Sequence, residues 1–242
     1  MTQKSLAKIM GITLIIMPCN PGISQDYQTR DKKDQGYESL FDGKSTEGWR
    51  GYQMDHVPGK WVVEEGTLHF NPRGKGDGGT LIYDKIFANF HLKLEWKISR
   101  KGNSGIFYLG SENEAYHEIY ESCPEMQVLD NERHPDAKKG RDGNRKAGSL
   151  YDLIPADPQY CKAVGEWNLV EVIHKDGHVI HKMNGETVVE YQVGTPEWKE
   201  LVANSKFPPY NPNWADLNKE GYIGLPDHGD KVWFRNIQIK EL

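Results

Sequence analysis

His91-Leu92-Lys93-Leu94-Glu95-Trp96-Lys97-Ile98 alternates strictly between polar and apolar side chains. Successive side chains of a β-strand point to opposite faces of the sheet. The four apolar side chains of this stretch should therefore line one face, and the four polar ones the other. A strand with one buried and one solvated face is typical of an antiparallel sheet.

Other short strands are predicted on both sides of this stretch. Asn184-Gly185 stands between two β-like runs and is a strong signal for a hairpin, and Glu65-Gly66 is a second predicted turn. Only 196–205 looks helical, with Thr195 as N-cap and Pro196 at the first position. The remaining strands are expected at 61–64, 67–70, 105–109, 167–174, 179–183, 186–191, 221–224 and 232–239. The sequence thus predicts an all-β domain, a jelly-roll β-sandwich of two antiparallel sheets with one short helix.

Composition narrows the classes of partner. The 242-residue chain has a net charge of −5, so it offers neither a basic field for nucleic acid nor a polybasic membrane patch. Its 25 glycines and 13 prolines suit many short strands joined by turns. Its 7 Trp, 12 Tyr and 7 Phe supply core groups and platforms for ligands.

The first residues resemble an export signal. Lys4 and Lys8 precede an apolar stretch at 9–17 that is too short to span a bilayer, and small residues at 22–24 favour cleavage before Gln25. Cys19 raises a lipoprotein alternative, although 16–18 makes a poor lipobox. We therefore predict a signal peptide at 1–24, a flexible linker at 25–36, a single domain at 37–242, no transmembrane helix, and export to the periplasm or cell surface.

Two cysteines, Cys123 and Cys161, belong to the predicted domain. Disulfides persist in exported proteins, so the sequence leaves two alternatives open, a bridge between these cysteines or two free thiols. No C-x-x-C pair or Cys/His zinc spacing is present.

An acidic stretch at 124–136, PEMQVLDNERHPD, carries the candidate chemistry. It begins as a strand, in which Glu125 and Gln127 would share one face. Asp130 would join them only if one residue bulges out, as happens beside active sites, or if the end of the strand brings it near. The plainer interpretation of such a strand is a solvated edge.

Other polar groups stand near predicted strand ends. Asn103 lies between Gly102 and Gly105, where backbone can approach a ligand closely. Asp42 fits a turn, and Arg235 fits a structural ion pair with a carboxylate. Trp167 suits the core or a sugar platform, and His228 suits a loop or a ligand contact.

The motifs together resemble the family of exported bacterial proteins called the 3-keto-disaccharide hydrolase domain. The resemblance covers nearly all of the predicted domain, and Pro124 and Pro226 depart from the residues common in that family. The matching motifs, in chain order, are LFDGK and GW within 40–49, GNSGI at 102–106, PEMQVLDNERHPDA at 124–137, AGSLYDL at 147–153, GEWN at 165–168, NGE at 184–186 and GYIGLPDHGDKVWFRNIQIKEL at 221–242.

This resemblance implies a concanavalin A-like lectin/glucanase sandwich and a carbohydrate substrate that a separate sugar 3-oxidoreductase has oxidised to a ketone at C3. It implies that a base removes the C2 hydrogen, that the aglycone leaves C1, and that water adds back. The predicted catalytic residues are Glu125, Asp130 and His134. The predicted substrate-binding residues are Gln127, Asn103, Lys97, His228 and Trp49.

Two other classes remain open from the sequence. One is a conventional glycoside hydrolase, against which stands the lack of a second carboxylate in register with Glu125. The other is a non-catalytic carbohydrate-binding module, which the same fold supports. A divalent ion serving as a Lewis acid is a further option, with Glu125, Asp130, His134 and His228 as its candidate ligands.

Overall fold

The computed structural model describes residues 36–242. The predicted signal peptide at 1–24, most of the predicted linker at 25–36, and Cys19 lie outside the described residues. Within the described part of the chain, no helix is long and apolar enough to cross a membrane.

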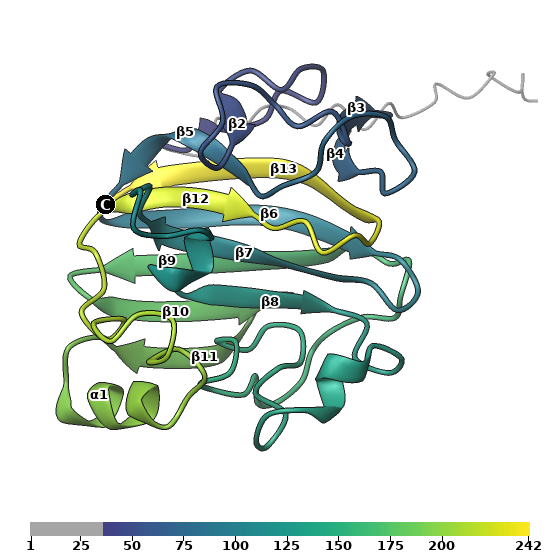
Figure 1. The fold of residues 1–242 in the computed structure, drawn as a ribbon. Helices are drawn as coiled ribbons and strands as arrows, with labels where there is room; N and C mark the ends of the chain where they lie inside the picture. The colour runs from purple at the N-terminus through teal and green to yellow at the C-terminus, as the bar shows by residue number, and fades with distance from the viewer. Residues whose placement is uncertain (1–35) are drawn as a thin grey trace, which may run out of the picture. The chain divides into compact units, whose positions relative to one another are not determined.

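The strands form two antiparallel sheets that lie face to face (Figure 1). The larger sheet has the strand order β11-β10-β9-β6-β13-β4-β3, and β1 pairs with β13 beside it. Its strands are β1 (Glu38–Ser39), β3 (Trp61–Glu64), β4 (Thr67–Phe70), β6 (Phe90–Ile98), β9 (Asn168–Lys175), β10 (His178–Met183), β11 (Glu186–Gln192) and β13 (Val232–Glu241).

The smaller sheet has the strand order β2-β5-β12-β7-β8, and it carries the candidate site. Its strands are β2 (Trp49–Gly51), β5 (Leu81–Phe87), β7 (Asn103–Gly110), β8 (Glu125–Leu129) and β12 (Gly221–Leu225). Figure 1 shows β12, β7 and β8 as neighbouring strands of one layer. The predicted all-β fold of two antiparallel sheets is confirmed.

Strand β6 organises the core. Every second residue from Phe90 to Ile98 is buried, as the alternation predicted, and the intervening side chains lie on the outer face of the larger sheet. The buried side chains pack with residues of the smaller sheet, such as Ile106 and Met126, into one hydrophobic cluster. Burying apolar area in this way contributes roughly 25 cal/mol per Å², which makes the inter-sheet contact the main source of stability.

The predicted turns and the helix are also found. Asn184 and Gly185 form the β10–β11 hairpin with positive φ angles of 52° and 96°, a conformation that these residue types tolerate. Helix α1 spans Pro196–Ala203, and the Thr195 side chain accepts a hydrogen bond from the Trp198 backbone N–H at 3.1 Å. Two short 3₁₀ helices, η1 (Ile119–Glu121) and η2 (Pro135–Lys138), flank β8 in the chain.

Two smaller predictions are confirmed as structural roles. The Asp42 carboxylate accepts hydrogen bonds from the backbone N–H groups of Lys44 and Ser45, both at 2.7 Å, and so forms a turn. Arg235 pairs with Glu95 across β13 and β6 at 2.7 Å. Neither side chain lies near β8.

The structure decides between the two alternatives for the cysteines, because it holds Cys123 and Cys161 as free thiols. Each sulfur donates instead to a nearby backbone carbonyl, Cys123 to Ile119 at 3.2 Å and Cys161 to Lys162 at 3.3 Å. Burial raises the pKa of the Cys161 thiol to about 12 and also raises that of the Cys123 thiol well above its ordinary value. Both thiols should therefore be unreactive in the folded protein.

We expect protein lacking residues 1–24 to show almost no fast-reacting thiol when native, and two thiols after denaturation without reductant. The measurement is a thiol titration at neutral pH in both states, with a reduced and desalted sample as the control. A count of zero reactive thiols after denaturation would show that Cys123 and Cys161 form a disulfide.

Candidate active site

A pocket of about 170 Å³ lies on the outer face of the smaller sheet, over β7 and β8. The loops that precede β8, follow η2 and follow α1 form its walls. Its lining residues are Asn103, Phe107, Tyr120, Cys123, Glu125, Gln127, Tyr151, Lys206, Phe207, Tyr210 and His228.

The strand period explains which residues reach this pocket. In β8, Met126 and Val128 belong to the inter-sheet core, so Glu125 and Gln127 face outward. Gln127 accepts a hydrogen bond from the Val128 backbone N–H through its side-chain oxygen at 3.0 Å. Its amide nitrogen has no such partner among the described residues and is the group that remains for a ligand.

The Glu125 side chain lies over Gly105 of β7, a position that has no side chain. A Cβ atom at Gly105 would stand 2.7 Å from the Glu125 carboxyl carbon and 2.8 Å from its Cγ, so only glycine fits there. Glu125 is 7% exposed, and its Oε1 is buried without a hydrogen-bond partner among the described residues. This burial raises the pKa of Glu125 to about 8.

Lys206 supplies the cation on the opposite wall of the pocket. Its Nζ lies 4.3 Å from the centre of the Tyr151 ring and 5.6 Å from that of Tyr120. Burial lowers the pKa of Lys206, and the charge of Glu125 opposes that effect. Sequence analysis did not find Lys206, because this residue lies 81 positions from Glu125 and in no motif that we recognised.

A buried ion-pair network holds this wall in place. Arg145 contacts Asp136 at 3.0 Å and Asp152 at 2.6 Å. The Tyr151 hydroxyl donates to Asp136 at 2.7 Å, and the Lys206 backbone N–H donates to Asp152 at 2.8 Å. Both carboxylates are therefore occupied in positioning Tyr151 and Lys206.

Asn103 and His228 complete the pocket, as predicted for ligand contacts. The Asn103 side-chain oxygen is buried without a hydrogen-bond partner among the described residues, while its backbone N–H donates to Asp230 at 3.1 Å. His228 stands exposed at the pocket rim, where desolvation by the surrounding loops lowers its pKa and favours the neutral imidazole near pH 7. Two acceptor oxygens beside the pocket, on Asn103 and Glu125, are thus buried without a hydrogen-bond partner among the described residues, which is rare in folded proteins.

Asp130 and His134 do not line this pocket. The Asp130 carboxylate accepts backbone N–H groups of Lys101 at 2.7 Å and of Arg133 at 3.2 Å. The His134 ring nitrogen Nδ1 accepts the Asp136 N–H at 3.1 Å and caps η2. The predicted bulge is absent, because β7 and β8 pair without a register shift. Side chains therefore alternate without interruption along β8, and this alternation points Asp130 to the face opposite Glu125.

Lys97 and Trp49 are also placed elsewhere. Lys97 lies on the outer face of the larger sheet, between Trp167 and Trp233, at 4.9 and 4.7 Å from the ring centres. Trp49 is 5% exposed and donates its indole N–H to the Leu40 carbonyl at 2.7 Å. The predicted grouping of these two residues with Glu125 does not hold. Lys97 belongs to the other sheet, which alternation along a strand cannot reveal, whereas Trp49 is on β2 of the smaller sheet but is buried in the core.

The four predicted metal ligands are not brought together either. Among residues 36–242, no group of three or more His, Cys, Asp or Glu side chains is arranged to hold a metal ion. Glu125 and His228 share the pocket, whereas Asp130 and His134 are engaged by backbone N–H groups.

Two facing antiparallel sheets with a polar pocket on the outer face of one define the class, a β-sandwich of the lectin and glucanase type. A family model described as the 3-keto-alpha-glucoside-1,2-lyase-like domain matches residues 36–240, and the chain belongs to that family.

Individual relatives agree with this assignment. A Bacteroides thetaiotaomicron protein named 3-keto-disaccharide hydrolase is 48% identical over 228 residues, which cover 86% of this chain and 79% of that protein. A crystal structure from Parabacteroides distasonis superposes with a TM-score of 0.77 at 32% identity, covering 88% of this chain and 97% of the other. A Bacillus subtilis protein with a galectin-like fold shares the fold alone, with a TM-score of 0.50 at 12% identity over 85% of this chain and 98% of that one.

The buried Glu125 carboxyl should make stability depend on pH. Folded protein keeps this proton up to about pH 8, whereas the unfolded chain releases it near 4.5, so the contribution of Glu125 to stability is lost as pH rises between these values. We expect Glu125→Gln to gain in melting temperature relative to wild type from pH 4 to pH 8.

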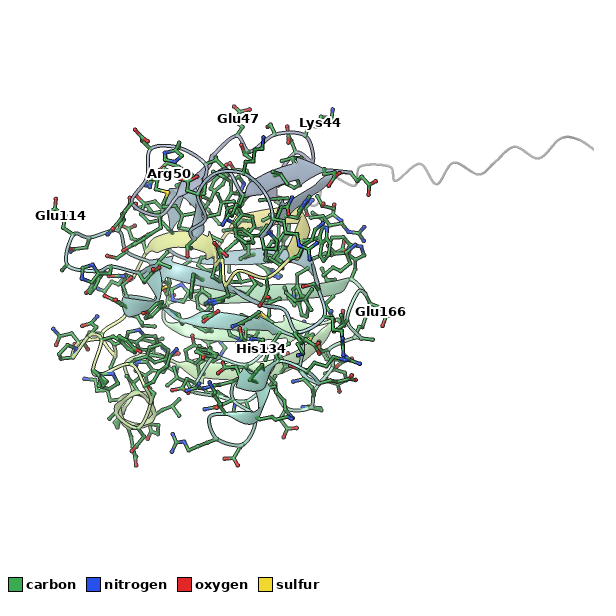
Figure 2. The ribbon with its side chains drawn as sticks, turned by 45° about the vertical axis from the view of Figure 1, so that its right-hand side comes forward. Lys44, Glu47, Arg50, Glu114, His134 and Glu166 are labelled. Atoms are coloured by element: carbon green, nitrogen blue, oxygen red, sulfur yellow. The ribbon has the colours of Figure 1, made fainter. Side chains whose placement is uncertain are left out.

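Glu114→Gln removes an exposed carboxylate (labelled in Figure 2) that does not line the pocket and is the matched control, for which no such trend is expected. A melting-temperature difference between Glu125→Gln and wild type that stays constant over this pH range would contradict the raised pKa.

Proposed function

We propose that this protein cleaves the glycosidic bond of 3-keto glycosides in the pocket over β7 and β8. The family and the name of the Bacteroides relative support this substrate class. The observation that carries the proposal is a single buried carboxyl group of raised pKa, Glu125, which faces a lysine in the same pocket.

The chemistry requires a base rather than a pair of acids. A C3 ketone acidifies the C2 hydrogen, so Glu125 can take that proton while negative charge develops on the C3 oxygen. The electrons then form the C1–C2 double bond as the C1–O bond to the aglycone breaks. Water adds at C1, and the proton returns to C2, which completes the hydrolysis. A carboxylate of raised pKa is a stronger base than an ordinary one, which favours the first step.

Cationic and hydrogen-bonding groups around Glu125 suit the enolate. We assign Lys206 to the developing charge on the C3 oxygen, because a partly buried ammonium acts strongly on nearby charge. Asn103 and Gln127 would bind sugar hydroxyls, and His228 would deliver a proton from solvent to the aglycone oxygen as the C1–O bond breaks. Asp130 and His134 would act as positioning residues through the backbone that they hold.

A conventional glycosidase mechanism fits this pocket poorly. It needs two carboxyl groups flanking the bond, roughly 5–5.5 Å apart for retention or 6.5–9.5 Å apart for inversion. Among the described residues, Glu125 is the one carboxylate that lines the pocket. Asp136 and Asp152 lie behind it and are already paired with Arg145.

The proposed substrate places the protein in a reaction sequence. A sugar ring acquires a C3 ketone by oxidation of its hydroxyl, so a separate sugar 3-oxidoreductase must act first. The residues at 1–24 support export of this protein to the periplasm or cell surface, with lipidation of Cys19 as the alternative form.

Substrate specificity is the first test. Purified protein should release monosaccharide from a 3-keto-disaccharide and leave the parent disaccharide intact, because the unoxidised ring has no acidic C2 hydrogen. Product formation from both sugars is measured by chromatography under identical conditions. Equal rates on the two, or activity on the parent alone, would refute the proposal.

The second test removes the base. Glu125→Gln keeps the shape of the side chain but cannot take a proton, so turnover should fall about 10²–10⁴-fold, the usual contribution of general acid–base catalysis. Wild-type kcat/KM should rise with pH and level off above about 8, because Glu125 must be ionised. A kcat/KM that falls through this range would assign Glu125 as the acid.

Two further variants separate the roles around Glu125. Gln127→Ala should mainly raise KM, since it removes a contact to the sugar. Lys206→Met should lower kcat and move the rise in kcat/KM to higher pH, because the Lys206 charge lowers the pKa of Glu125. An unchanged pH profile of kcat/KM in Lys206→Met would show that Lys206 does not act on Glu125.

A further inference from the structure

A second pocket, of about 490 Å³, opens at the end of the sandwich that carries the carboxyl terminus. It shares no lining residue with the Glu125 pocket. Its walls come from both sheets, with His174 on β9 and Leu109 on β7. Its volume lies within the range of roughly 300–1,000 Å³ that small-molecule sites occupy.

The rim of this end pocket is held by hydrogen bonds between separate segments. The Asn89 side chain accepts from the Asp176 backbone N–H at 2.9 Å and donates to the Asp176 carboxylate at 3.3 Å. The Leu242 backbone N–H donates to the Asn89 carbonyl at 3.0 Å. The turn after β5, the turn after β9 and the chain end are thereby joined, so the pocket is largely preformed.

An irregularity in β7 shapes its inner wall. Opposite β12, two residues of β7, Tyr108 and Leu109, stand against Ile223 alone, and Leu109 has a φ of 61°. As a result, both Tyr108 and Leu109 belong to the inter-sheet core instead of alternating. Positive φ is rare for leucine, and such strained positions occur preferentially at ligand sites.

His174 presents a buried acceptor to this pocket. It follows Val170 and Val172 on the core face of β9, where an apolar residue is expected, and it is 4% exposed. Its Nδ1–H donates to the Ala88 carbonyl at 2.6 Å, which leaves Nε2 as an acceptor. Nε2 has no hydrogen-bond partner among the described residues, but this atom is not among the fully buried ones. Because His174 lines the end pocket, Nε2 faces that pocket.

We propose that the end pocket is a second binding site, for a neutral hydroxylated molecule of monosaccharide size whose hydroxyl donates to His174 Nε2. The Asp176 carboxylate at the rim accepts further hydroxyls, and Leu109, Val193 and Leu217 contact the C–H faces of the ligand. The positive charge of Lys219 at the same rim repels a cationic ligand, which disfavours an amine as the occupant of this pocket. Burial lowers the pKa of His174, so the acceptor is available at neutral pH.

The test uses D-glucose as the probe, with full-length Glu125→Gln protein in which turnover at the first pocket is suppressed. Glucose carries no ketone, and this site does not depend on the proposed function. We expect saturable NMR shifts at the backbone amides of Asn89, Gly177 and Asn218, and at His174 Nε2, when glucose is added. Leu217→Trp fills the pocket from its rim and should weaken this binding at least tenfold.

Two controls keep the outcome interpretable. Ala203→Trp places the same side chain at an exposed position outside this pocket and should leave the shifts unchanged, with the melting temperature checked for both tryptophan variants. His174→Gln retains a short polar side chain and should also weaken binding. Absence of saturable shifts, equal affinity in wild type and Leu217→Trp, or binding of butylammonium in preference to glucose would each overturn the proposal.

Discussion

The candidate site depends on one buried carboxyl group that the protein leaves without a hydrogen-bond partner. Glu125 lies over Gly105, where a methyl group would displace it, and its Oε1 is sealed against the sheet. A buried unpaired polar group costs roughly 1–3 kcal/mol or more, so a fold retains it only where something else depends on it. Here the result is a carboxyl group that holds its proton to about pH 8.

The surroundings of Glu125 follow from this constraint. Two carboxylates close behind it, Asp136 and Asp152, are neutralised by Arg145, so they do not supply a second acid to the pocket. The same network orients Tyr151 and Lys206, which bring one positive charge to the wall that faces Glu125. A single base beside a single cation suits removal of an activated proton, and suits poorly a reaction that needs two carboxyl groups.

Much of this fold was predictable because it rests on local patterns. The alternation in β6, the Asn184-Gly185 turn and the Thr195 cap each act within a few residues. The shared face of Glu125 and Gln127 follows from the same period. Lys206 was not predictable, since only the tertiary fold carries it to β8, and Lys97 was misplaced because β6 belongs to the other sheet. Strands β2 and β5 lacked a clear period and were missed.

The most direct test of the central claim is a kinetic isotope effect at C2. A 3-keto-disaccharide carrying deuterium at C2 should react more slowly than the unlabelled sugar, with a kcat/KM ratio clearly above unity at pH 7, because Glu125 must break that bond before the aglycone leaves. A ratio of unity, together with retention of the C2 deuterium in the released sugar, would contradict proton abstraction at C2. Cleavage would then begin at the glycosidic oxygen.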